Sequence, residues 1–292
     1  MNPRWPIYIP SKGRADSCLT MRHLDSMRVP YLVIVEEEER AAYARTIDPS
    51  RLLVLDPSYQ ERYDPFDDDG LSKSIGSGPA RNFAWDHAVA AGWPWHWIVD
   101  DNIKGWFRFN HNLKVPCADG TVLRCMEDFV ERYRNIAMAG PHYFMFVSRK
   151  QENIPPFVLN TRIFSCNLIR NDVPFRWRCR YNEDLDLSLR MLKAGWCTVL
   201  FNAFLQYKLP TQMMGGGNTE AFYSREGTLP KSQMIVRAHP DVARLAWKFG
   251  RWHHQVDYSS FKRNKLLRRD DVRLEPGVDN YGMVLRRRDD AA

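Results

Sequence analysis

Apolar runs alternate with stretches of helical spacing in the first hundred residues. Four segments are short, apolar and rich in β-branched or aromatic residues, as strands are: 6–11, 31–39, 51–56 and 95–102. Three intervening segments carry apolar residues at helical spacing: 17–27, 38–47 and 78–92. Strands that are almost wholly apolar and alternate with helices predict an α/β fold with a mostly parallel, doubly wound, Rossmann-like sheet.

The second half of the chain has a more mixed pattern. Segments 141–150 and 155–170 are predicted strands of antiparallel character, followed by a helix over 181–196 and another strand over 197–209. Two stretches rich in Gly, Ser, Asp or Pro are predicted loops: 57–79 and 211–220. We expect one domain over residues 1–260 and a basic segment, 261–292, packed on it or trailing from it.

Composition narrows the class of protein. The chain has 292 residues and a net charge of +7, with basic residues concentrated in 262–288, which suits a polyanionic partner as well as a solvated tail. No apolar run approaches the roughly 18 residues of a membrane span, and the N-terminus lacks a signal-peptide core. We therefore expect no membrane partner, a cytoplasmic location and free, mostly buried cysteines.

Polar clusters follow three of the predicted strands. Residues 11–14 read Ser-Lys-Gly-Arg, Glu36 and Glu37 follow the second strand, and Asp100-Asp101-Asn102 closes the fourth. Ligands of doubly wound sheets bind beyond the carboxyl ends of the strands, so these clusters are predicted to face one crevice.

The Asp100-Asp101-Asn102 cluster places hard oxygen ligands at a strand end. Such ligands suit Mg²⁺ or Mn²⁺ bridging a protein carboxylate and substrate phosphates, and a cation would offset the repulsion between the two acids. The alternative is an ordinary turn, because Asp and Asn are common turn formers. The segment by itself leaves both open.

Acidic residues also open the predicted helix after Asn182. Glu183 and Asp184 are candidates for a general base, because a carboxylate on a rigid element can take a proton from an acceptor hydroxyl. The alternative is stabilisation of the helix by its dipole, at about 0.3–1 kcal/mol for each acid.

Three further motifs are weaker. GSGPARN (76–82) puts glycines and an arginine at a helix start that favours phosphate, although a plain loop and helix start explains it equally. GGGN (215–218) predicts a lid or a close approach to a ligand, or only a loop. FGRWHHQVDY (249–258) holds adjacent histidines, of which His254 or His253 is a candidate metal ligand or phosphate donor; a structural role is the alternative.

In their order along the chain, these motifs resemble GT-A glycosyltransferases. IYIPSKGR, GPARN, IVDDN, NEDLDLSLR, GGGN and GRWHHQVDY are most similar to the TET-associated glycosyltransferases encoded by bacteriophages, over roughly residues 6–260. The resemblance implies transfer of a sugar from a nucleotide-sugar, UDP-sugar by preference, to 5-hydroxymethylcytosine in DNA. It also implies a divalent cation, Mn²⁺ or Mg²⁺.

The resemblance implies roles residue by residue. Contact with the nucleotide-sugar is expected from Pro10, Ser11, Lys12, Gly13, Arg14, Glu36, Gly78, Arg81, Asn82, Asp100, Gly216 and Gly217. The metal is expected at Asp101 and Asn102, with His254 completing the metal or diphosphate site. Asp184, by preference, or Glu183 is expected to deprotonate the acceptor. Asn102 departs from the family's Asp-x-Asp pattern, which leaves the metal ligand open.

The acceptor substrate is the least determined part of the expected function. Basic residues in 262–288 and the side chains of Trp106, Trp177 and Trp252 are candidates for phosphate contact and base stacking, with core packing as the alternative for the tryptophans. Two other functions stay open: transfer to a glycan, lipid head group or small molecule, and a catalytically silent DNA-binding relative. Inversion or retention at the anomeric carbon, the sugar and the oligomeric state are likewise undetermined.

Overall fold

The computed structural model describes residues 1–66, 76–110, 112–149, 154–209 and 228–273. The glycine-rich stretch 211–220, with the predicted donor contacts Gly216 and Gly217, lies outside these residues. Residues 67–75 of the predicted 57–79 loop also lie outside them, and the described remainder contains a short helix, α3 (Ser58–Glu61).

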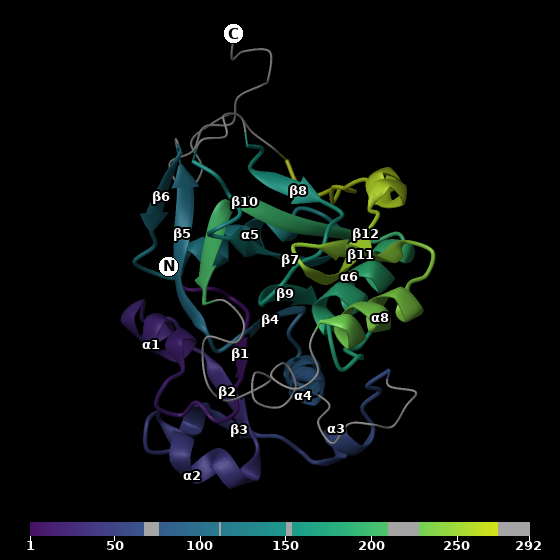
Figure 1. The fold of residues 1–292 in the computed structure, drawn as a ribbon. Coiled ribbons are helices and arrows are strands. Elements are labelled where there is room, and N and C mark those ends of the chain that lie inside the picture. Colours follow the sequence, from purple (N-terminus) through teal and green to yellow (C-terminus); the bar gives the residue numbers. More distant parts are fainter. Residues whose placement is uncertain (67–75, 111, 150–153, 210–227, 274–292) are drawn as a thin grey trace.

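A mixed sheet of ten strands runs through the described part of the molecule (Figure 1). The strand order is β3-β2-β1-β4-β9-β7-β10-β5-β6, and β8 pairs with β10 outside this path. The strands are β1 (Ile7–Pro10), β2 (Leu32–Val35), β3 (Leu52–Val54), β4 (Trp95–Val99), β5 (Ile103–Asn110), β6 (Leu113–Pro116), β7 (Ile136–Tyr143), β8 (Phe157–Leu159), β9 (Cys166–Arg170) and β10 (Cys197–Lys208).

Helices and one separate hairpin complete the described elements. The other helices are α1 (Leu19–Ser26), α2 (Arg40–Tyr43), α4 (Gly78–Ala90), α5 (Thr121–Val130), α6 (Glu183–Lys193) and α8 (Leu229–Ala238), with 3-10 turns η1 (Glu37–Glu39), η2 (Pro49–Arg51) and η4 (Ser259–Arg263). The hairpin consists of β11 (Ala243–Lys248) and β12 (Arg251–Val256).

The first half of the sheet is parallel, as its apolar strands predict. β1 pairs in parallel with both β2 and β4, and β2 pairs in parallel with β3. The second half is mixed: β9 runs antiparallel to β4 and β7, whereas β10 is parallel to β7 and antiparallel to β5. The predicted α/β fold with a mixed second half is therefore confirmed.

Two predicted strands have the wrong bounds. The strand expected over 141–150 is β7, which begins at Ile136 and ends at Tyr143. The strand expected over 155–170 is in fact β8 and β9, separated by a turn in which Asn160 and Ser165 both have positive φ angles. A left-handed backbone cannot continue a strand, and periodicity does not reveal it.

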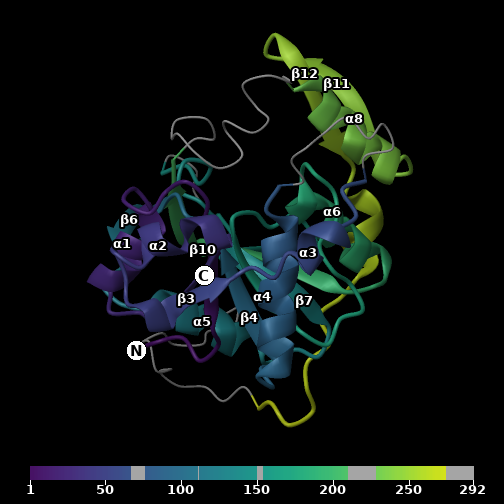
Figure 2. The same ribbon diagram turned by 90° about the horizontal axis from the view of Figure 1, so that it is seen from below.

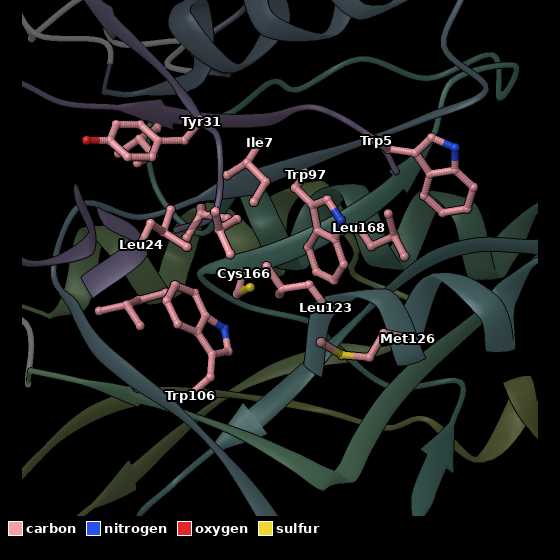
Figure 3. Packing of buried hydrophobic residues seen from close by; sticks show 14 of the residues in the cluster. Trp5, Ile7, Leu24, Tyr31, Trp97, Trp106, Leu123, Met126, Cys166 and Leu168 are labelled. Carbon is pink, nitrogen blue, oxygen red and sulfur yellow. The ribbon is translucent and has the colours of Figure 1, made fainter. Parts of the chain in front are cut away.

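Helices cover the sheet on both faces. On one face, Leu24 of α1 and Leu123 and Met126 of α5 belong to the same core cluster as Ile7 and Trp97 of the sheet (Figure 3). On the other face, residues of α4 and α6 pack in a second cluster, which includes Tyr8, Ile34, Ala84, Trp85, Ile98 and Leu187. A sheet buried on both faces needs strands apolar on both sides, which explains their continuous apolar sequence.

The buried residues decide two predictions. The described cysteines are free, and Cys18, Cys166, Cys179 and Cys197 are buried, as expected. Trp106 and Trp177 are fully buried in the core, which supports the alternative of core packing and not a role in stacking on nucleic acid. A large indole contributes most when its apolar area is removed from water, and core packing achieves this.

The predicted basic segment begins at a packed position. Phe261 is buried in a cluster with Leu185 and Leu189 of α6, so the chain stays on the domain beyond residue 260. Asn264 continues this attachment, because its side-chain amide donates to the backbone oxygen atoms of Leu192 and Trp196. The domain boundary itself stays a prediction.

Candidate active site at the carboxyl edge of the sheet

Several strands end at the same edge of the sheet. Because β9 is antiparallel to both β4 and β7, these two strands point the same way, together with β1, β2, β3 and β10. A cavity of about 620 Å³ lies at their carboxyl ends. Residues at or directly after these strand ends line it: Pro10, Ser11, Val35, Glu36, Leu55, Asp100, Tyr143 and Lys208.

The structure brings most of the predicted site residues into this one cavity. Those that line it are Pro10, Ser11, Lys12, Arg14, Glu36, Arg81, Asp100, Asp101, Asn102, Glu183, Asp184 and His254. They come from loops after β1, β2 and β4, from the first turns of α4 and α6, and from β12. Polar clusters that are far apart in the sequence therefore form one wall, as the strand-end pattern predicted.

Gly13, Gly78 and Asn82 are predicted donor contacts that do not line the cavity. The backbone N–H of Gly13 donates to Glu39. A side chain at Gly78 would overlap the ring of Tyr63, so this glycine serves close packing of α4.

Asn82 has a structural position. Its amide donates to the backbone oxygen of Trp177 (2.9 Å), and its oxygen accepts from the backbone N–H of the same residue (2.8 Å). A role of Gly13, Gly78 or Asn82 in contacting the donor is therefore not supported.

Asp101 ties β4 to the loop after β1. Its carboxylate accepts hydrogen bonds from the hydroxyl of Ser11 (2.8 Å) and from the guanidinium of Arg14. Its backbone oxygen accepts from the N–H groups of Leu19 and Thr20 at the start of α1. Burial raises the pKa of Asp101, and Arg14 opposes this rise. Asp101 thus holds the loop after β1 and the start of α1 against the end of β4, beside the cavity.

Asp100 lies between two cations. One carboxylate oxygen accepts from Arg81 (2.9 Å) and the other from the ammonium of Lys208 (2.6 Å), which also donates to the hydroxyl of Ser165 (2.8 Å). Burial works to raise the pKa of Asp100, but Lys208 and Arg81 outweigh it and lower the pKa. The repulsion expected between adjacent acids is therefore offset by cations of the protein itself.

Arg81 joins the acids of β4 and α6. From the first turn of α4, where it is 4% exposed, its guanidinium contacts Asp184, lies 2.9 Å from Asp100 and lies 3.5 Å from Glu183. The same group lies over the indole of Trp177, 4.6 Å from the ring centre. Planar guanidinium suits such multiple contacts better than a point charge does.

Asp184 is buried in this network. One oxygen accepts from Arg81 and from the amide of Asn167 (3.1 Å), and the other accepts a long bond from the N–H of Ser165 (3.4 Å). Burial raises the pKa of Asp184 to about 6; Arg81 opposes this, while Glu183 and Asp100 add to it. A carboxyl group with a pKa near neutrality is suited to accept a proton.

Asp186 belongs to the same acidic segment but faces away from the cavity. It is fully buried and accepts hydrogen bonds from Arg178, Arg190 and the imidazole of His239. Burial works against its charge, but His239 and Arg178 lower its pKa to about 2. This acid therefore holds the start of α6 in place.

Sequence reasoning missed several residues of the cavity wall. Tyr143, Arg162, Ser165, Lys208 and Lys231 line the cavity and had no assigned role. Lys208 is a charged residue at the end of a largely apolar strand, which is the same sequence feature that identified Asp100. Ser165 had no such signal, because only the turn before β9 directs it to the cavity.

The predicted metal ligands do not fit a cation held by Asp101. Both oxygens of that carboxylate are occupied by Ser11 and Arg14. The side-chain oxygen of Asn102 and Nδ1 of His254 are buried without a hydrogen-bond partner, but as metal ligands they would bring no negative charge. Within the described ranges, no group of three or more His, Cys, Asp or Glu residues could hold a metal ion.

The fold and the cavity first define a class: a GT-A-like α/β protein whose site lies beyond the carboxyl ends of its strands. The family model of the TET-Associated Glycosyltransferases matches residues 5–217. The chain belongs to this family and is a glycosyltransferase. A search of curated proteins finds no match. None of the described helices combines the length and apolar character that a membrane crossing requires.

Replacing Asp186 tests the structural role of its carboxylate. We expect Asp186→Asn to lower the free energy of unfolding by about 3 kcal/mol, because the partly buried guanidinium groups of Arg178 and Arg190 lose their buried anion. The charged carboxylate stabilises the fold above the unfolded pKa of about 4, and this contribution is lost as the pH falls through about 2. Urea denaturation at pH 7 measures the change.

The matched control is Asp172→Asn, because Asp172 forms an exposed pair with Arg170. This substitution is expected to change stability by less than about 1 kcal/mol. Equal, small losses in the two variants would show that Asp186 does not hold α6.

Proposed function

We propose that the protein transfers a sugar from a nucleotide-sugar donor, a UDP-sugar by preference, to the hydroxyl of 5-hydroxymethylcytosine in DNA. The observation that carries the proposal is the convergence of Arg81, Asp100, Asp184 and Lys208 in the cavity at the carboxyl edge. Family membership supplies the reaction class. The cavity volume of about 620 Å³ is suitable for a small polar ligand.

The loop after β1 and the end of β2 are the proposed nucleotide side of the cavity. Lys12 donates to Glu36 (2.6 Å) and Gln60 donates to the same carboxylate (3.1 Å), so Glu36 is held at the rim. Arg14 is fixed by Asp101 below them. This supports a base and ribose lying over Ser11 to Arg14, with Glu36 as a hydrogen-bond acceptor.

Lys208 and Arg81 are the proposed partners of the donor diphosphate. Both are largely buried and carry positive charge next to Asp100. When a diphosphate enters, it can share these cations with Asp100, so the charge developing on the leaving group meets a site that is already arranged. Low solvent access strengthens this interaction relative to the same contacts in water.

Asp184 is the proposed general base, and Glu183 is the alternative on the same turn. The acceptor hydroxyl gives its proton to the more weakly bonded oxygen of Asp184, the one that accepts from Ser165. The hydroxyl oxygen then forms a bond to the anomeric carbon. The bond from that carbon to the diphosphate oxygen breaks, and its electron pair leaves with the nucleoside diphosphate.

A divalent cation, Mn²⁺ or Mg²⁺, stays a prediction from the family resemblance. A bound cation would supply additional charge to a diphosphate. Because the carboxylates at the end of β4 already hold Arg14, Arg81 and Lys208, we assign stabilisation of the leaving group to the chain's own cations.

A transfer assay with Asp184→Asn tests the function and the base together. Labelled sugar should pass from UDP-sugars to hydroxymethylated duplex DNA, but not to unmodified DNA. We expect Asp184→Asn to lower kcat by about 10²–10⁴-fold, because no carboxylate takes the proton. For the wild type, kcat/KM should fall as the pH drops below about 6, where Asp184 becomes protonated.

Glu183→Gln is the paired variant. If kcat/KM of Glu183→Gln no longer fell at low pH, and Asp184→Asn were still active, Glu183 would be the general base. Transfer to free glycans or small molecules in preference to hydroxymethylated DNA would overturn the proposed acceptor, and donor binding without turnover would indicate a silent relative.

Lys208→Met tests the proposed source of positive charge. Loss of this ammonium is expected to lower kcat by about 10²–10³-fold, whereas Lys208→Arg should retain more activity because the charge remains. If a divalent cation assists as well, as the family resemblance implies, EDTA should lower wild-type transfer and Mn²⁺ should restore it. Activity that disappears in EDTA, returns with Mn²⁺ and survives Lys208→Met would show that a metal ion, and not Lys208, supports the leaving group.

A further inference from the structure

The β11–β12 hairpin ends in a tight turn with an unusual residue. Phe249 and Gly250 connect the strands, and both have positive φ angles of 51° and 72°. Such two-residue turns normally place Asn, Asp or Gly at the first position, because a larger side chain is disfavoured there. Here a phenylalanine occupies it and is 92% exposed. Neither turn geometry nor burial explains this choice.

Other aromatic side chains near the turn are also exposed. Trp247 is 61% exposed and Trp252 is 37% exposed, and their rings contact each other edge to face at 5.3 Å between centres. The ring of Phe249 meets the imidazole of His253 in the same way at 6.2 Å. The register pairs Trp247 with Trp252 and Ala246 with His253, so the two ring pairs lie on opposite faces of the hairpin. Exposed aromatic rings at the end of a hairpin are typical of a binding surface.

The charge of the hairpin is of one sign. Residues 243–256 contain Arg244, Lys248 and Arg251, together with two histidines, and no Asp or Glu. Aromatic rings interleaved with cations are the combination that binds nucleic acid, through base stacking and phosphate contact.

The hairpin is continuous with the proposed active site. Ala246, Lys248, His253, His254, Gln255 and Val256 line the same cavity as Asp100 and Asp184. Helix α8 packs against both strands and adds Lys231 to the cavity wall. A ligand bound on the hairpin can therefore extend directly into the cavity that holds Asp100 and Asp184. The hairpin also lies beyond residues 5–217, the range that matches the family model.

The described part of the basic C-terminal segment lies elsewhere. The side-chain amide of Asn264 donates to the backbone oxygen of Trp196, just before β10. The backbone oxygen of Leu267 accepts from the N–H of Arg134, just before β7. These contacts are at the amino ends of the strands, opposite the cavity. In Figure 2 the hairpin stands at the top and the yellow segment descends to the bottom. The predicted contact of DNA with residues 262–273 is therefore not supported, and 274–288 lie outside the described residues.

We propose that the β11–β12 hairpin is the docking element for duplex DNA. The inference rests on the proposed function, because that function supplies the DNA acceptor. Arg251 and Arg244 contact phosphates, and Phe249, whose ring packs against His253, stacks on a base beside the modified cytosine. Asp184 is largely buried, so a base that remains stacked in a duplex cannot bring its hydroxyl to this carboxylate. The aromatic tip takes the place of the extruded base in the stack.

The test compares hairpin variants with variants of the opposite edge. Phe249→Ala and Arg251→Glu change side chains that do not line the cavity. Their matched controls are Trp93→Ala, an exposed tryptophan before β4, and Arg268→Glu in the C-terminal segment. Binding to a hydroxymethylated duplex is measured by fluorescence anisotropy at several salt concentrations, and transfer kinetics are measured with the duplex and with the free 5-hydroxymethyl-deoxycytidine nucleoside.

We expect the hairpin variants to weaken duplex binding by about tenfold or more and the controls to bind like the wild type. Arg251→Glu should also lower the slope of log Kd against log salt by about one. The KM for duplex should rise more than the KM for the nucleoside. Unchanged duplex binding in both hairpin variants would overturn the inference while leaving the proposed reaction intact.

The same experiment distinguishes the two proposals. Wild-type protein that binds the duplex through the hairpin but transfers no sugar to it would contradict the proposed function alone. Wild-type protein that binds no DNA would contradict the docking role, and transfer to the free nucleoside would then decide the reaction. A thermal melt of every variant verifies that each one is folded.

Discussion

The contacts of Arg81 hold the candidate site together. One buried guanidinium reaches Asp100 after β4 and both Glu183 and Asp184 in the first turn of α6. Without it, like charges on separate elements would face one another in a poorly solvated space, at a cost of several kcal/mol. The ion network therefore determines how closely α4, α6 and the end of β4 approach, and so the shape of the cavity.

The network also explains why the cavity is suited to an anionic leaving group. Lys208 and Arg81 are held by Asp100, so their charges are in position before any ligand arrives. A site arranged in advance needs little reorganisation when negative charge develops. Burial, with a contribution from Glu183 and Asp100, raises the pKa of Asp184 to about 6 in the same network. Stabilisation of a leaving group and proton transfer can thus come from one connected set of side chains.

Much of the site was predictable because it follows from strand ends. Ser11, Glu36 and Asp100 each come directly after an apolar strand, and parallel strands present such positions at one edge. Asn82 does not line the cavity, and a motif at a helix start does not show which of its residues turn inward. Ser165 was missed because its position depends on a left-handed turn between β8 and β9. The exposure of Phe249 was equally hidden, since a turn pattern does not reveal burial.

The sequence by itself determined the class of fold, the parallel first half of the sheet and the edge at which polar residues gather. Hydrophobic periodicity and the alternation of strands and helices along the chain can both be read locally. Only the tertiary structure decided the partners of each charge: Asp101 with Arg14, Asp100 with Lys208, and Asp186 with His239 away from the cavity. The ion pair of Lys208 with Asp100 joins residues 108 positions apart, and such geometry is set by packing that no local pattern encodes.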